Sequence, residues 1–221
     1  MTAQLGARIR QARLAQGLSL RATAGAAAIS PSLLSQVETG KVQPSVSTLY
    51  AIVNTLGLSV DDVLGTASTP EATRRQLPAH PVQRWETAPE ILMENGVSWR
   101  GLAVAGGGVD ALHVTYQPGA ASSLDDSHMR HEGVEYGYII RGEITLKLDF
   151  DSHVLRPGDS FCFDSMRPHL YLNHTDAVSE GVWFVMGQAR RGESVADPSP
   201  VMRSAVDVLD AMSRLPGRAE V

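Results

Sequence analysis

The stretch HMRHEGVEYGYIIRG, residues 128–142, decides how the second half of the chain is interpreted. His131 and Glu135 stand at the start of a run in which apolar and polar residues alternate, the pattern of a β-strand. Imidazole and carboxylate groups close together are a common ligand set for divalent metals. Met129 stands two residues before His131, where a second ligand would fall, and His128 is off register by one residue, on the other face of a regular strand. The stretch therefore raises the question of an altered metal site.

A second stretch, RPGDSFCFDSMRPHLYLN at residues 156–173, places a Pro-Gly-Asp turn before a strand and His169 after it. Similar alternation, interrupted by Gly, Pro, Asp and Asn turns, extends through much of the sequence beyond about residue 100. The segments that show it are 111–119, 135–150, 153–163 and 168–175. The second half of the chain is therefore predicted to be all-β.

Residues 3–64 have a helical period, and each helix carries start and stop signals. Serine precedes four helices and glycine follows several, as expected for N-caps and C-caps. The first helix spans about residues 3–16 and ends at Gly17, the second runs from Ser19 to about residue 27, the third begins at Ser30 and Pro31 and stops at Gly40, the fourth spans Ser45 to Gly57, and Ser59 caps a last short turn. The first half is therefore predicted to be a bundle of five helices.

These two patterns divide the chain into four segments. Residues 1–66 form the helical domain and residues 91–190 the β domain, with a linker at 67–90 that is rich in Pro, Thr and Ala and has no period. Residues 191–221 return to a helical pattern, which fits either a helix packed on a partner chain or a frayed tail.

The composition is that of an ordinary globular protein, with 43% hydrophobic and 19% charged residues in 221. The single cysteine, Cys162, excludes an internal disulfide framework and a multi-cysteine zinc site, and its place between two phenylalanines predicts that it is buried. No secretory signal or membrane-spanning run is recognisable, so a cytoplasmic location without membrane contact is expected. Residues 1–64 carry a net charge of +2 and the remainder −7, which fits a small basic module joined to an acidic one.

The segment LSLRATAGAAAISPSLLSQVETGKVQPSVSTLYAIVNTLGLSVDDVLG resembles the Cro/repressor-type helix-turn-helix of the XRE family over about residues 5–64. Ala24 occupies the small position where two helices cross, and SPSLLSQVE matches the recognition helix. Ala28 departs from the family, which usually has glycine at this turn, so the turn geometry could be altered. The resemblance implies binding to operator double-stranded DNA.

The residues that would contact DNA follow from this resemblance. A helix that begins at Ser30 and Pro31 points its first turn into the major groove, and its exposed side chains reach base edges. Gln36 suits a bidentate contact to adenine and Leu33 suits the methyl group of thymine. Other side chains and helix N-termini are placed for phosphate contacts. The predicted DNA-binding residues are Ser19, Arg21, Ser30, Ser32, Leu33, Gln36, Lys41 and Ser45.

The β half resembles a cupin, a double-stranded β-helix or jelly-roll barrel, over about residues 100–187. The first cupin motif is carried by His131, Glu135 and Gly142, with Met129 in place of its first histidine. The second motif is carried by Pro157, Gly158, Asp159, His169 and Asn173. The fold class predicted for the whole chain is therefore multidomain, an all-α five-helix domain followed by an all-β cupin.

In metal-bearing cupins the residues equivalent to His131, Glu135 and His169 converge inside the barrel. Two histidines and one carboxylate form a facial triad that suits one divalent ion (Fe, Mn, Ni or Zn), whereas a thioether such as Met129 is a poor ligand for such ions and fills space instead. The alternative is a hydrogen-bonded polar cluster, or a metal-free contact to a small ligand. The predicted effector pocket consists of His131, Glu135, Tyr138, His169 and Tyr171.

The combined resemblance implies a transcriptional regulator, in which the helical domain binds operator DNA and the cupin binds a small-molecule effector. A module of this size reads a short site, so a homodimer on a pseudo-palindrome is expected. No catalytic residue is assigned. The alternative function is a mononuclear-iron oxidase or epoxidase that carries a helix-turn-helix domain, and a scaffold that mediates only protein contacts is a third.

Overall fold

The computed structural model describes residues 2–64, 82–103 and 109–187. Most of the predicted linker and the whole of the predicted C-terminal helix, residues 191–221, lie outside the described residues. Within the described part of the chain, no helix is long and apolar enough to cross a membrane.

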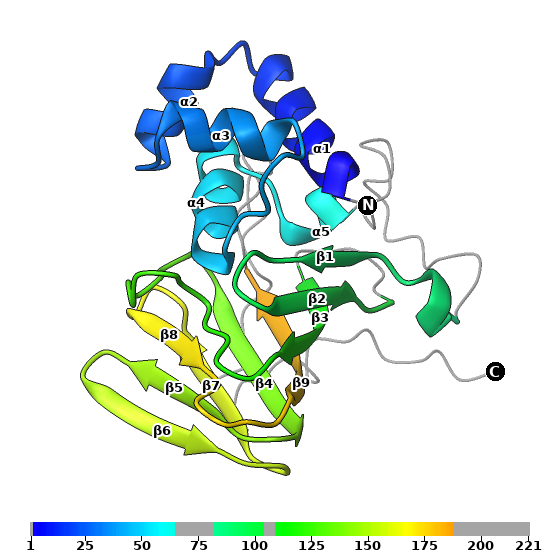
Figure 1. Ribbon diagram of the computed structural model, residues 1–221, viewed down its shortest axis with the longest axis vertical. Coiled ribbons are helices and arrows are strands. Elements are labelled where there is room, and N and C mark those ends of the chain that lie inside the picture. Colours follow the sequence, from blue (N-terminus) through cyan, green and yellow to red (C-terminus); the bar gives the residue numbers. More distant parts are fainter. Residues whose placement is uncertain (1, 65–81, 104–108, 188–221) are drawn as a thin grey trace, which may run out of the picture. The chain divides into compact units, whose positions relative to one another are not determined.

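Five helices form the N-terminal part, in the predicted order (Figure 1). All four serines predicted as N-caps act as such: the hydroxyls of Ser19, Ser30, Ser45 and Ser59 accept hydrogen bonds from main-chain N–H groups in the first turns of α2, α3, α4 and α5. Gly57 ends α4 in the left-handed conformation, at φ 63°. The helices are α1 (Thr2–Ala15), α2 (Leu20–Ala26), α3 (Pro31–Glu38), α4 (Val46–Leu56) and α5 (Val60–Leu64).

A buried ion pair ties α3 to α1. The guanidinium of Arg13 donates from Nε to Glu38 Oε1 at 2.6 Å and from a terminal nitrogen to Glu38 Oε2 at 2.7 Å. Both side chains are less than a tenth exposed. The planar, two-point contact fixes the orientation of α3 as well as its distance from α1.

The turn between α2 and α3 keeps the geometry usual for a helix-turn-helix despite its alanine. Ala28 adopts φ 54°, the left-handed conformation that glycine takes without strain. Its side chain is exposed, so the methyl group gains no packing that would offset the strain. The sequence-based concern that the turn is altered is therefore answered: the conformation is retained and the alanine is strained.

Among residues 82–103 and 109–187, nine strands form two antiparallel sheets. One sheet has the order β1-β2-β3-β9-β4-β7 and the other the order β6-β5-β8 (Figure 1). A 3-10 turn, Trp85–Thr87, precedes the first of these strands. The strands are β1 (Glu90–Leu92), β2 (Val97–Gly101), β3 (Val109–Tyr116), β4 (Val134–Arg141), β5 (Ile144–Leu148), β6 (Asp151–Leu155), β7 (Ser160–Asp164), β8 (His169–Leu172) and β9 (Ser179–Met186).

Alternation along the strands decides which side chains enter the space between the sheets. On β7, Phe163 is 5% exposed while its neighbour Cys162 is exposed, so the prediction of a buried cysteine is wrong. The two phenylalanines flank Cys162 on the inner face, and period 2 turns the thiol outward. The strands β1 and β2 begin before residue 100, where strands were not predicted, because each is too short to show a clear alternation.

Two residues of the cupin motifs have structural roles. The Asn173 amide donates to the carbonyls of Tyr116, Gln117 and Ala177, while its oxygen accepts from the hydroxyl and amide of Thr175. Asn173 thereby joins the end of β8 to the end of β3 and to its own turn. Gly142 has φ 73°, and a Cβ there would collide with the Val178 carbonyl, so only glycine fits.

We expect Ala28→Gly to raise the free energy of unfolding by about 1 kcal/mol, because it removes the left-handed strain at an exposed position. Urea denaturation followed by circular dichroism would measure this change. Ala26→Gly, in the last turn of α2, is the matched control and should lower stability by about 0.5–1 kcal/mol. Equal destabilisation by both substitutions would contradict a strained turn.

Candidate functional site

The predicted DNA-reading residues occupy α3. Ser32 and Gln36 are exposed and Leu33 is partly buried, whereas the neighbouring Leu34 and Val37 are buried in the helical core. The exposed side of α3 therefore carries Ser32 and Gln36, whereas Leu33, the third residue predicted to reach base edges, also packs against the core.

The predicted phosphate contacts divide into two groups. Ser19, Arg21, Ser30 and Lys41 are exposed, and the first three lie at the starts of α2 and α3. Ser45 does not fit its prediction. It is 3% exposed, and its hydroxyl bonds to Ser47 and Thr48, so it caps α4 inside the molecule instead of facing a phosphate.

A buried cluster of His131, Glu135 and His169 lies between the two sheets of the cupin. His131 stands in the loop before β4, Glu135 on β4 and His169 at the start of β8. The Nε2 atoms of the two histidines lie 3.4 and 3.5 Å from Glu135 Oε2. The structure thus brings these three predicted residues together, and Met129 pairs its backbone with His169 beside them.

The two imidazole rings are oriented by main-chain carbonyls. His131 Nδ1 lies 3.2 Å from the Glu132 carbonyl oxygen, and His169 Nδ1 lies 2.8 Å from that of Arg167. Donation from Nδ1 leaves the Nε2 lone pair of each ring directed into the cluster. Burial lowers the pKa of His169 from its ordinary value, which favours the neutral ring that a metal requires.

Glu135 is held as a carboxylate. Burial, the largest influence, favours its neutral form, but the interactions with His131, His169 and Tyr171 together bring the Glu135 pKa below its usual value. The Tyr171 hydroxyl donates to Glu135 Oε1 at 2.9 Å, and burial raises the Tyr171 pKa well above 10, so the phenol keeps its proton.

These residues fit a divalent ion. Three buried atoms, His131 Nε2, His169 Nε2 and Glu135 Oε2, have no hydrogen-bond partner among the described residues. The three residues offer ligand atoms that lie within 4.8 Å of one another. Buried polar atoms without partners are costly, and an ion of radius suited to two imidazoles and one carboxylate would satisfy all three at once. The group could therefore hold a metal.

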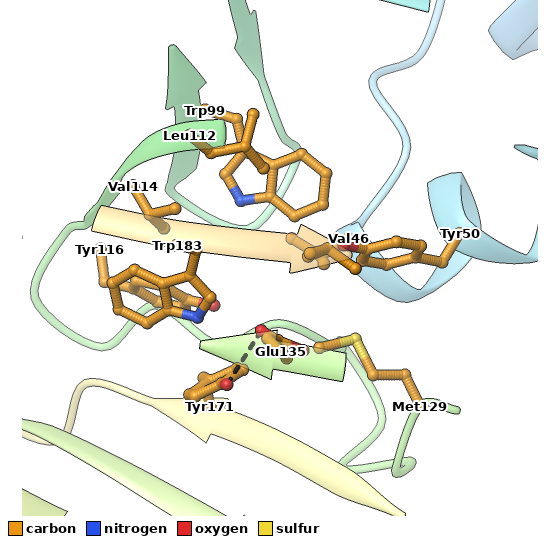
Figure 2. Close-up of a pocket in the computed structure, with 11 residues that line it drawn as sticks. Val46, Tyr50, Trp99, Leu112, Val114, Tyr116, Met129, Glu135, Tyr171 and Trp183 are labelled. Carbon is orange, nitrogen blue, oxygen red and sulfur yellow. Dashed lines mark hydrogen bonds between the residues drawn. The ribbon is translucent and has the colours of Figure 1, made fainter. Parts of the chain in front are cut away.

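A small cavity adjoins the cluster, and its wall is formed by aromatic and aliphatic side chains around Glu135 (Figure 2). Of the tyrosines predicted for the effector pocket, Tyr171 lines this cavity together with Glu135. Tyr138 does not line it: its side chain is 48% exposed on the outer face of β4, because three positions separate it from the inward-facing Glu135. The cavity is lined by Val46, Tyr50, Trp99, Leu112, Val114, Tyr116, Met129, Glu135, Tyr171, Trp183 and Val185.

Several of these lining residues were not predicted. Trp99 and Tyr116 sit at inward positions of β2 and β3, and alternation could have found them had those strands been recognised in full. Val46 and Tyr50 belong to α4 of the helical domain, and no pattern within the sequence indicates that they reach the cupin.

Comparisons with known proteins agree with both parts of the fold. Residues 4–64 match the model of a helix-turn-helix domain, and residues 112–185 match that of the cupin domain. The HTH-type transcriptional regulator PuuR of Escherichia coli is 28% identical over 78% of this chain and 89% of its own length. The regulator DdrOP3 of Deinococcus deserti is 44% identical over 57 residues, which cover 26% of this chain and 44% of its own.

Among solved structures, an HTH_3 family transcriptional regulator from Vibrio cholerae superposes with a TM-score of 0.62. The match covers 85% of this chain and 97% of that chain at 21% identity. At this identity the likeness shows the fold alone. Because the match covers most of the chain, the likeness in fold extends over both the helical and the β part.

Proposed function

The chain is a helix-turn-helix regulator of the XRE type with a cupin domain, and from this premise we propose that α3 binds operator DNA and the cupin cavity binds a small-molecule effector. The observation that carries the proposal is that two separate sites, each suited to a different ligand, lie in the two domains of one chain. The exposed side of α3 has polar side chains suited to base edges, while the cupin encloses a polar cluster within an aromatic wall.

Regulation requires that the effector distinguish two arrangements of the protein. An effector changes operator affinity only if it binds the DNA-competent and DNA-incompetent arrangements with different affinities, and the DNA then changes effector affinity by the same factor. The helical and cupin domains are in direct contact through main-chain hydrogen bonds from Ser47 to Ser122 and from Glu94 to Pro44. These contacts supply a physical route for such coupling.

We place one divalent ion, Fe, Mn, Ni or Zn, on His131, Glu135 and His169. The ion would supply a Lewis-acidic centre with open positions at which a polar group of the effector can bind. The protein contributes the orientation of the two rings, the carboxylate charge and an apolar surrounding that excludes water.

The same triad would suit a mononuclear-iron oxidase or epoxidase, which is the alternative function. Its support is weaker, because the relatives found by sequence are named as transcriptional regulators. The enzyme would be favoured if iron-loaded protein consumed oxygen with a candidate substrate and protected no DNA sequence in a footprinting experiment.

We expect the purified full chain, prepared without chelator or a metal-affinity tag, to carry about one equivalent of metal by elemental analysis. Glu135→Gln and His169→Ala should each lower metal affinity at least ~10-fold, because even groups that only orient ligands have effects of this size. His128→Ala is the matched control, since His128 is exposed and outside the cluster. A wild-type protein that binds none of the four metals when they are added would contradict the metal site.

We expect Gln36→Ala to weaken binding to an operator selected from random duplexes by about 1–3 kcal/mol, because one bidentate base contact is lost. Gel-shift titration at fixed salt would measure it, with Gln11→Ala on the exposed side of α1 as control. Unchanged affinity and unchanged base preference would remove Gln36 from the reading set.

We also expect a homodimer, which operates in the cytoplasm on a two-fold operator with half-sites about 10 base pairs apart. Size-exclusion chromatography with light scattering at micromolar concentration would report the mass. A monomer, both free and on selected DNA, would contradict the two-fold model.

A further inference from the structure

Tyr50 is a residue of the helical domain whose ring completes the wall of the cupin cavity. Its side chain is 3% exposed, and both of its aromatic partners belong to the cupin. The ring stacks on His131 with centroids 4.0 Å apart and planes 7° from parallel, and meets Trp99 edge-to-face at 5.4 Å. Figure 2 shows Tyr50 and Val46 reaching the cavity from α4.

With Tyr50 in place, the cavity is too small for an effector. The free space is about 10 Å³, which is about enough for one water molecule. Sites for small metabolites have volumes of about 300–1,000 Å³. Among the lining residues, only Tyr50 and Val46 come from outside the cupin, so the wall that they form is the part that can withdraw without unfolding the barrel.

A chain of hydrogen bonds joins the same wall to α4. Tyr171, which donates to Glu135 through its hydroxyl, accepts the Ser122 N–H at its carbonyl at 2.9 Å and donates its own N–H to the Ser122 hydroxyl at 3.1 Å. The Ser122 carbonyl accepts from the Ser47 N–H at 3.0 Å, in the first turn of α4. A change at the cluster therefore reaches α4 both through the Tyr50 ring and through Ser122.

The helix α4 cannot move alone within its domain. It packs against α1 and α2, and both of these helices pack in turn against α3. A shift of α4 away from the cupin therefore displaces the recognition helix with it, because a packed core transmits a movement instead of absorbing it.

We propose that Tyr50 is a gate contributed by the DNA-binding domain: it closes the cupin cavity, and the cavity opens to an effector only when the helical domain moves. The inference rests on the proposed function and specifies how the two activities are linked. Occupation of the cavity and the closed arrangement exclude each other, so the effector changes the position of α3 relative to the cupin. By linkage, operator DNA changes the opening of the cavity.

The test uses diethyl pyrocarbonate, which modifies accessible histidines, on the full chain freed of metal by a chelator. Mass spectrometry of peptides gives the modification rate at His131, which is 2% exposed beneath the Tyr50 ring. We expect Tyr50→Ala to raise this rate about tenfold or more, because the stacked ring is lost, and Tyr50→Phe to leave it near the wild-type rate. Tyr136→Ala, at an exposed tyrosine of β4, is the matched control.

Equal rates for wild type and a folded Tyr50→Ala protein would overturn the gate. If Tyr50→Ala fails to fold, the wild-type chain alone decides. In that case the rate of His131 modification is measured with and without selected operator DNA. A changed rate supports the gate, and an identical rate overturns it. Failure of the proposed function is a different result, in which the wild-type chain selects no DNA sequence at all.

Discussion

A carboxylate buried between two sheets sets the requirements that the cupin part must meet. Glu135 is 3% exposed, and an isolated charge in such a place would cost many kcal/mol. Tyr171 of β8 lowers this cost by donating a hydrogen bond to Oε1, while Oε2 faces the Nε2 atoms of His131 and His169, where a divalent ion would supply the missing positive charge. Because β4 and β8 belong to different sheets, the cluster also joins the two sheets at one point.

The same arrangement explains why the cluster fits a metal and why its surroundings are aromatic. In both rings Nδ1 is paired with a main-chain carbonyl oxygen. The two Nε2 atoms are therefore left to face the Glu135 carboxylate. Trp183 meets Tyr171 and Phe161 edge-to-face beside this point, and the Phe161 ring is tilted against that of Tyr171, so the surroundings are apolar. Polar atoms that converge without partners in an apolar shell are the physical signature of a binding site.

Contact between the domains makes the two halves of the protein interdependent. The helical domain on its own would expose Tyr50 and Val46, which are buried here against the cupin. Asp110 of β3 accepts a hydrogen bond from the Val60 N–H, at the start of α5, so the acidic cupin also supplies charge to a helix N-terminus of the basic domain. In the proposed mechanism no separate signalling element is needed, because part of the wall of the cavity that would take the effector belongs to the helical domain.

The sequence by itself determined the local structure and the chemistry of the cluster. Serine caps, glycine stops and the change from helical to alternating period follow from backbone and packing preferences that act over a few residues, and the motif spacing identified His131, Glu135 and His169. Strand parity, applied in full, would have placed Tyr138 and Cys162 on the outer face. Only the tertiary structure decided that Ser45 is buried and that Tyr50 covers His131. Contacts between distant segments depend on how whole elements pack, and no local pattern encodes them.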